Sequence, residues 1–322
     1  MDSNALEVMY RLEGIFIPLA TMRREHLHKH NIRFVHYTSA ENALKIITSK
    51  QVWMRNARCM ADYMEVIHGH QMLVQFFAQS KNKDAFHKVM NRCFKDIGEE
   101  TINAFDQQWN NLQWDIYISS ISEHDQAEDS YGRLSMWRAF GRLPARAALV
   151  LNLPAPGSAV GLGVALSPVA YLDYNGVEKL MKKIIANVRS NVDFLRTLDR
   201  ERVKASIFEM LSVTAVSLKH VGFKEEKEWR VIYMPQVRPS NLITWATEVV
   251  EGIPQVVHKI PLTDRPDNDL VGVEIPALVE RVIIGPTAFP VTIGHAFMIA
   301  LTQAGVPNAA SRVMVSSIPL RQ

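Results

Sequence analysis

The sequence predicts an α+β fold in which a mixed, largely antiparallel sheet forms the core and helical layers flank it. Strand-like and helix-like stretches follow one another in blocks, whereas a doubly wound fold would alternate them strictly. Two stretches with a helical hydrophobic period, residues 64–112 and 177–221, interrupt the strand-like parts of the chain. The glycine-rich segment 157–163 lacks the G-x-G-x-x-G spacing, and no helical pattern follows it. We therefore expect a hairpin or loop there, and no phosphate-binding turn.

The composition is that of a soluble globular protein. The chain has 322 residues, of which 48% are hydrophobic and 21% charged, and its formal net charge is +3. A dedicated nucleic-acid binder usually carries a more concentrated basic stripe. Cys59 and Cys93 are too few for a disulfide framework and indicate free thiols. Residues 1–4 lack the positive charge of a signal peptide, and no apolar run is long enough to span a bilayer. We therefore expect a cytoplasmic protein.

The chain is expected to consist of a helical lead-in over residues 1–30 and a single domain over residues 31–322. The domain opens with a short strand, after which Thr38 and Glu41 stand at capping-box spacing, so Thr38 is expected to cap a helix. Asp199 is a second expected cap, in the second helical stretch. Strands are expected at residues 34–37, 52–54, 116–121, 147–153, 164–171, 229–234, 257–260, 282–284 and 313–315.

The last helix is expected to begin at a Thr292 cap and to end at Gly305. Threonine is a favourable cap because its hydroxyl accepts from an otherwise unpaired amide of the first turn. Glycine is favoured just after a helix because it adopts the left-handed conformation without strain. This helix would lie between the last two strands of the sheet.

Two polar clusters lie beside the first two expected strands. His36-Tyr37-Thr38-Ser39 closes the first strand, where His36 could donate to a ligand hydroxyl beside the free N–H groups of the following helix. Alternatively, a backbone carbonyl at the edge of the core satisfies this imidazole. Asp62 and Glu65 follow the second strand, and Asp62 either caps the next helix or faces the mouth of a cleft with Glu65.

Two further clusters accompany later strands. Ser120 and Ser122 lie on the strand that begins near residue 116, followed by a polar loop and by Trp137, which is either a core residue or a ligand platform. Glu226, Glu228 and Arg230 are expected to alternate onto one face of another strand. Three charges on one face cannot be buried unpaired, so this face is either exposed or lines a polar cleft. A glutamate in a cleft can bind a ribose hydroxyl or stabilise a cationic sugar-like transition state.

Taken in order, these clusters resemble the bacterial domain-of-unknown-function family 2971. The pattern of that family is H-Y-T-S, a tryptophan strand, N-D-x-x-E, S-x-S, M-W, an F-K stretch ending in E-x-E-x-R, I-I-x-G and a terminal S-x-I-P-x-R. Here the corresponding residues are His36-Tyr37-Thr38-Ser39, Val52-Trp53, Asp62 and Glu65, Ser120-Ile121-Ser122, Met136-Trp137, Phe223-Lys224 with Glu226, Glu228 and Arg230, Ile283-Ile284-Gly285, and Ser317-Ile318-Pro319-Leu320-Arg321. Ala61 replaces the usual asparagine, and the F-K stretch is shorter than usual before its acidic pair.

The order of these motifs is also similar to that of the ADP-ribosyltransferase superfamily. This resemblance implies a split sheet and NAD as the substrate. It implies NAD contacts from His36, Tyr37, Thr38, Ser120, Ser122, Trp137 and Arg230, with Tyr37 or Trp137 stacking on the nicotinamide ring and His36 touching its amide or ribose. Glu228 would bind the ribose 2′-hydroxyl and stabilise the oxocarbenium-like centre. Glu226 would orient or deprotonate the acceptor, and Arg230 would hold the carboxylates or a phosphate.

The function implied by the resemblance is an NAD-dependent ADP-ribosyltransferase or NAD glycohydrolase. Such an enzyme could be a phage-defence or toxin effector that modifies a protein or nucleic acid acceptor, with no membrane partner. Two alternatives stay open: a non-enzymatic sensor module that binds a nucleotide or a protein, and a metal-dependent nuclease that uses Asp62, Glu65, Glu226 and Glu228. His68 and His70 do not suggest a metal site, because residues two apart lie on different faces of a helix. A homo-oligomer or a regulatory partner is also left open.

Overall fold

The computed structural model describes residues 3–60, 63–139 and 145–319. Their contacts divide the chain into two compact units, each made of three segments. The first unit comprises residues 1–26, 56–116 and 165–224, and the second comprises residues 27–55, 117–164 and 225–322. The two helical stretches expected from the sequence thus belong to one unit together with the first N-terminal helix and most of the second.

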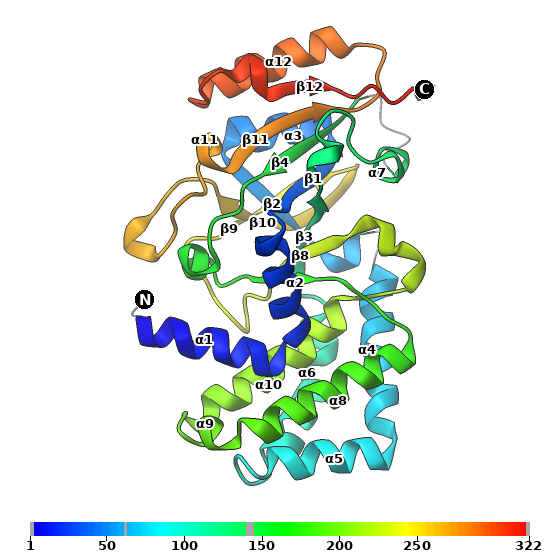
Figure 1. Cartoon of the computed structure of the whole chain (residues 1–322), viewed down its shortest axis with the longest axis vertical. Coiled ribbons are helices and arrows are strands. Elements are labelled where there is room, and N and C mark those ends of the chain that lie inside the picture. Colours follow the sequence, from blue (N-terminus) through cyan, green and yellow to red (C-terminus); the bar gives the residue numbers. More distant parts are fainter. Residues whose placement is uncertain (1–2, 61–62, 140–144, 320–322) are drawn as a thin grey trace. The chain divides into compact units, whose positions relative to one another are not determined.

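The first unit is helical. Its long helices are α1 (Ser3–Phe16), α2 (Pro18–Lys29, whose last turn belongs to the second unit), α4 (Tyr63–Ala78), α5 (Ser80–Met90), α6 (Ile97–Leu112), α8 (Tyr174–Ser190) and α10 (Arg200–Val216), with the short η1 (Ala57–Cys59) and α9 (Val192–Arg196). Helix α10 packs against α4 and α6, and α8 packs against α1, α4 and α5 (Figure 1). Asp199 caps α10 as expected, because its carboxylate accepts from the amides of Glu201 at 2.8 Å and Arg202 at 3.3 Å.

The strand expected at residues 164–171 forms two short strands, β5 (Ala165–Pro168) and β6 (Ala170–Tyr171). Strand β6 pairs in parallel with β7 (Leu218–Lys219), and the 3₁₀ helix η4 (Val221–Glu226) follows. This part of the chain is therefore less regular than expected.

The second unit is built on a mixed, mostly antiparallel sheet, as predicted (Figure 1). Its strands are β1 (Arg33–Ser39), β2 (Gln51–Asn56), β3 (Tyr117–His124), β4 (Arg146–Leu151), β8 (Glu228–Tyr233), β9 (Thr244–Val250), β10 (Ile253–Pro261), β11 (Val279–Ile284) and β12 (Val313–Val315). The order is β12-β11-β4-β1-β3-β2-β10-β9, and β8 pairs with β3. Only β11 and β12 form a parallel pair among the registers described for these strands. Strand β9 was not expected from the sequence.

Helices α3 (Ala40–Ser49) and α12 (Pro290–Gln303) pack on each other beside β1, β4 and β11 (Figure 1). The smaller elements of this unit are η2 (Gln126–Glu128), α7 (Leu134–Ala139), η3 (Pro156–Leu162), η5 (Pro266–Asn268), α11 (Ile275–Leu278) and η6 (Ala309–Arg312). The glycine-rich segment is thus a short 3₁₀ helix and not a hairpin. One hydrophobic cluster gathers around Trp137 and Tyr37, and another around Met54 and Tyr117.

Two expected caps were wrong. Helix α3 is capped by Ser39, whose hydroxyl accepts from Asn42 N at 3.0 Å, and not by Thr38. Thr38 stays in β1 because it pairs with Ala147 of β4, and this ladder continues to Ser39. Helix α12 starts at Pro290, ahead of Thr292, because the proline ring sets the backbone angle of a first helical residue. Gly305 follows the helix with φ of +85°, as expected of a residue after a helix end.

Candidate functional site

The expected polar cluster on β3 and β8 forms a hydrogen-bonded group in the second unit. In the register of these strands Ser120 lies opposite Arg230, and Ser122 lies opposite Glu228. Opposed residues of an antiparallel pair share a face, so the four side chains lie on one side of the sheet. Ser120 Oγ donates to Glu228 Oε1 at 2.6 Å. Arg230 donates to the same carboxylate from Nε at 2.9 Å and from Nη2 at 3.3 Å.

The Glu228–Arg230 ion pair is buried. Glu228 is 5% exposed and Arg230 is 1% exposed. Burial of two charges costs several kcal/mol per ion, and close pairing with good hydrogen bonds offsets this cost. Glu228 receives such bonds from Ser120 and Arg230. Arg230 was expected to hold either the carboxylates or a phosphate, and its guanidinium binds the carboxylate of Glu228.

Glu226 does not share this face, contrary to expectation. It ends η4, outside the strand, and its side chain is partly exposed. Between the two glutamates Lys227 has φ of +46°, a left-handed conformation that separates the 3₁₀ helix from β8. The period-two pattern expected from Glu226 to Arg230 therefore holds only from Glu228 onward.

His36 lies where β1 separates from β3. The pairing of these strands ends at Val35 opposite Ser122, and continued pairing would bring Tyr37 opposite Ser120. Instead, His36 Nδ1 lies 2.8 Å from the carbonyl oxygen of Ser120. Burial lowers the pKa of His36, and the bond to the Ser120 carbonyl opposes that shift only in part. The imidazole is therefore neutral at pH 7.

The partner of His36 also determines its tautomer. A carbonyl oxygen can only accept, so Nδ1 of His36 carries the proton and donates to Ser120. Nε2 is then unprotonated and is a hydrogen-bond acceptor. The donor role expected from the sequence is thus already taken by a backbone contact, and only the acceptor role at Nε2 is left to the ring.

Tyr37 and Trp137 have the contacts of core residues, and Thr38 is buried. The Tyr37 and Trp137 rings pack edge to face with centroids 4.9 Å apart, and Trp137 is fully buried. Trp137 Nε1 donates to the Tyr131 carbonyl at 2.7 Å. Burial, followed by the nearby Glu128 charge, raises the pKa of Tyr37, whose hydroxyl accepts from the amide of Arg133 at 2.8 Å. These contacts give no support to a ring-stacking role for either residue.

Arg133, which the sequence did not single out, ties the loop before β8 to the end of β3. Its guanidinium binds both carboxylate oxygens of Glu128 at 2.9 Å. It also donates to the carbonyls of Glu123 at 2.8 Å, Glu226 at 3.0 Å and Glu225 at 3.2 Å. The five donors of arginine suit such a junction. The only sequence signal was its position between the polar loop that follows β3 and Trp137.

The opposite face of β3 and β8 is closed by aromatic packing. Trp229 Nε1 donates to Glu123 Oε1 at 2.9 Å. The Trp229 ring also packs edge to face on Phe34 of β1, with centroids 5.4 Å apart. Glu123 and Trp229 are both buried. The polar group of Ser120, Glu228 and Arg230 is therefore backed by a packed layer on the other side of these strands.

A second charged network lies at the end of β3. Asp129 binds His124 Nε2 at 2.8 Å and Arg33 Nη2 at 2.5 Å, and Arg33 also pairs with Glu280. Burial would raise the pKa of Asp129, but hydrogen bonds from His124 and Arg33 outweigh it and lower this pKa. Each charge in this network has a partner, which is what a structural network requires.

The second expected cluster lies in the first unit. Glu65, on α4, forms an ion pair with Lys219 at 3.0 Å, and Lys219 is 2% exposed. Asp62, like Ala61, lies outside the described residues. Within residues 3–60, 63–139 and 145–319, no group of three or more His, Cys, Asp or Glu side chains could hold a metal ion.

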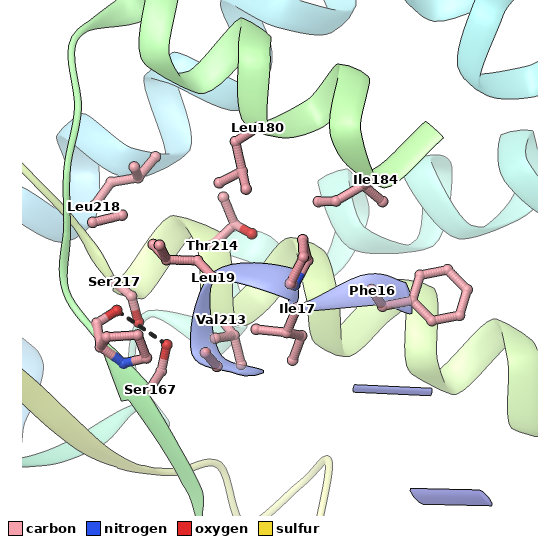
Figure 2. Close-up of a pocket in the computed structure, with 14 residues that line it drawn as sticks. Phe16, Ile17, Leu19, Ser167, Leu180, Ile184, Val213, Thr214, Ser217 and Leu218 are labelled. Atoms are coloured by element: carbon pink, nitrogen blue, oxygen red, sulfur yellow. Dashed lines mark hydrogen bonds between the residues drawn. The ribbon is translucent and has the colours of Figure 1, made fainter. Parts of the chain in front are cut away.

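A small pocket of the first unit is lined by residues that include Leu19, Leu180 and Thr214 (Figure 2). Its volume of about 30 Å³ corresponds to one or two water molecules. Ligand sites for small molecules are about tenfold larger. This pocket is therefore not a nucleotide site.

No known family model, curated protein or solved structure matches this chain. Among the described residues, no helix is long and apolar enough to cross a membrane.

Proposed function

We propose that the second unit carries an NAD-consuming site of the ADP-ribosyltransferase type, with Glu228 as its central carboxylate. The observation that carries this proposal is the convergence of His36 and Glu228 on one residue, Ser120, through its carbonyl and its hydroxyl. The branching of the sheet supports it further. Strand β3 contacts β1, β2 and β8, and β1 parts from β3 at His36. A split sheet of this kind is what the resemblance implies.

In the proposed reaction the bond between the ribose C1′ and the nicotinamide nitrogen of NAD breaks. Nicotinamide leaves with the bonding electron pair, and C1′ becomes oxocarbenium-like. Glu228 binds the 2′-hydroxyl and stabilises the positive centre by its charge. Water or an acceptor nucleophile on a protein or nucleic acid then adds to C1′ and releases its proton to Glu226, whose side chain is partly exposed.

His36 and Arg230 position these groups in the proposal. Arg230 and Ser120 hold the Glu228 carboxylate in one orientation, so little reorganisation is needed when charge develops on the sugar. His36 Nε2 accepts from the nicotinamide amide or from a ribose hydroxyl. Ser122 lines the same face of the sheet, next to Glu228. Tyr37 and Thr38 anchor β1 in the core, where the Trp137 ring packs on Tyr37.

The direct test is release of nicotinamide from NAD by the purified full chain. We expect turnover by the natural protein and loss of turnover in Glu228→Gln. Glu225→Gln is the matched control, because Glu225 is exposed and contributes only its carbonyl to Arg133. Transfer of an adenylate-labelled ADP-ribose to proteins or RNA separates a transferase from a glycohydrolase. Absence of both turnover and NAD binding in the natural protein would refute the proposal.

A cellular test addresses the proposed role as a defence or toxin effector. An NAD-consuming enzyme should slow growth when it is expressed, and Glu228→Gln should relieve that effect while Glu225→Gln does not. Cellular NAD, measured beside growth, should fall only in the strains that grow slowly.

The burial of Glu228 and Arg230 favours a second candidate function, a non-enzymatic sensor. A carboxylate that is 5% exposed and already paired can hold strands together without doing chemistry. Calorimetry distinguishes the two functions: a sensor binds a nucleotide with no nicotinamide release, and its binding survives Glu226→Gln.

A further inference from the structure

The hairpin of β9 and β10 ends the sheet of the second unit. The register of the pair runs from Val250 opposite Ile253 to Thr244 opposite Lys259. Among the described strands, β9 pairs with β10 alone. Glu251 forms the turn with a glycine, and both have positive φ, as a two-residue type I′ turn requires. The outer edge of β9 therefore presents backbone amides and carbonyls that can pair with another strand.

One face of this hairpin is apolar and exposed. Trp245 and Val249 on β9 are 68% and 66% exposed, and Val256 on β10 is 38% exposed. Val256 lies opposite Thr247, so all three apolar side chains share one face. Natural edge strands usually carry a charge that discourages pairing. The only charged residue of β9, Glu248, lies on the other face and is bound to Lys259 at 2.6 Å.

The turn determines which backbone groups of β9 point outward. The residues that flank a two-residue turn, Val250 and Ile253, form a hydrogen-bonded pair, and such pairs recur at every second residue. The even-numbered residues of β9 thus bond to β10. Trp245, Thr247 and Val249 direct their N–H and C=O groups away from the sheet.

We propose that β9 pairs antiparallel with β9 of a second copy of this chain, about a two-fold axis at Thr247. In this arrangement Thr247 lies opposite Thr247 of the second copy, and Trp245 lies opposite Val249. All these positions have outward backbone groups, so each opposed pair exchanges two hydrogen bonds. The two exposed apolar faces become one continuous surface on which each Trp245 covers a Val249. The interface is isologous, as a closed dimer requires.

Charge selects this register over its neighbour. With the axis at Thr247, Glu248 lies opposite Ala246 of the second copy. If the two-fold axis moves by one residue toward the turn, to Glu248, the residues with outward backbone groups still pair with one another. The two Glu248 carboxylates then lie directly opposite each other. Like charges at opposed positions destabilise a sheet pair. The axis at Thr247 also pairs all seven residues of β9, whereas a shift in either direction shortens the ladder.

Cysteine cross-linking tests the register. Residues 246 and 248 of opposite copies form a non-hydrogen-bonded pair, whose Cα separation of about 4.5 Å suits a disulfide. In a Cys59→Ser background, the double variant Ala246→Cys with Glu248→Cys should form a covalent dimer on oxidation. Each single variant should stay monomeric on a non-reducing gel. The double variant Ala246→Cys with Val250→Cys keeps Glu248, and its cross-linking would show the shifted register, in which residues 246 and 250 are opposed, and would overturn the proposed axis.

Sedimentation tests whether the dimer forms without a cross-link. The full chain should associate in a concentration-dependent manner, and Val249→Glu should raise the dissociation constant by roughly tenfold or more, because it places a carboxylate against the Trp245 ring, whose face is negative. The matched control is Val291→Glu on α12, where the natural residue is 83% exposed. A natural protein that stays monomeric, or a dimer that responds equally to both variants, would rule out β9 as the contact. Neither experiment depends on NAD turnover, so its result is separate from the proposed function.

Discussion

The hydroxyl of Ser120 donates to the carboxylate of Glu228 at 2.6 Å, across 108 residues of sequence. The carbonyl of the same serine accepts from His36. Three distant parts of the chain therefore meet at one residue of β3, at the point where β1 leaves it. The charge of Glu228, the register of β3 and the neutral imidazole of His36 all meet at Ser120, so few substitutions should be tolerated there.

The first prediction concerns the buried ion pair. Glu228→Gln should lower the free energy of unfolding by roughly 3 kcal/mol, because removal of one member leaves the Arg230 charge buried without its carboxylate. Urea denaturation followed by circular dichroism measures this loss.

The double variant Glu228→Gln with Arg230→Met serves as the control for this prediction. It removes both charges and should recover much of the lost stability, because uncharged replacements of a buried pair are often tolerated. Nicotinamide release should not recover with it. A Glu228→Gln protein as stable as the natural one would show that the pair is not buried as described.

The course of the sheet was largely readable from the sequence, because period-two apolar patterns mark strands that are buried on at least one face. Strand β9 escaped prediction for the opposite reason. Trp245 and Val249 are exposed at the edge of the sheet, and the strand is held there by its turn and by β10. Pairing with a neighbouring strand, and not burial, decides its conformation.

The candidate site was predicted in part. His36, Ser120 and Glu228 were expected together and are linked. The place of Glu226 was wrong because a single left-handed residue, Lys227, breaks the alternation, and no side-chain pattern marks it. Arg133 was missed because its partners are mainly backbone carbonyls, which carry no residue-specific signal in a sequence.

The second prediction is that Arg133→Lys destabilises the protein although it keeps the charge. A lysine ammonium cannot bind both oxygens of Glu128 and also reach the carbonyls of Glu123 and Glu226, since it lacks the planar fork of arginine. Loss of these charged hydrogen bonds should cost about 2–3 kcal/mol in thermal or urea unfolding. Arg138→Lys, at an exposed position of α7, should change stability little. Equal stability of the two variants would contradict the role of Arg133.

The third prediction separates the two candidate caps of α3. Ser39→Ala should cost about 1 kcal/mol of stability, because the amide of Asn42 loses its acceptor. Ser39→Asp should retain that stability, since aspartate also accepts from the first turn and its charge favours a helix N-terminus. If Ser39→Ala proves neutral in urea unfolding, another group caps this helix.

The fourth prediction concerns the buried histidines and pH. Burial lowers the pKa of His258, whose ring lies between Tyr117 and Tyr233 with centroid distances of 4.1 Å and 5.1 Å. Below the ordinary pKa of 6.5 the unfolded chain binds a proton at this residue that the folded chain does not bind. Stability should therefore be lost as pH falls from 6.5 toward the lower pKa of His258 in the folded chain. Above pH 6.5, His258 should contribute nothing to the change of stability with pH.

His258→Phe keeps the aromatic contacts and removes this titration. Relative to the natural protein, its stability should improve as pH falls below 6.5, by at most about 1.4 kcal/mol per pH unit. Burial also lowers the pKa values of His36 and His124. The His258→Phe variant should therefore still lose some stability as pH falls. Urea unfolding at a series of pH values between 5 and 8 measures both slopes, and parallel profiles for His258→Phe and the natural protein would exclude His258 as a source of the acid sensitivity.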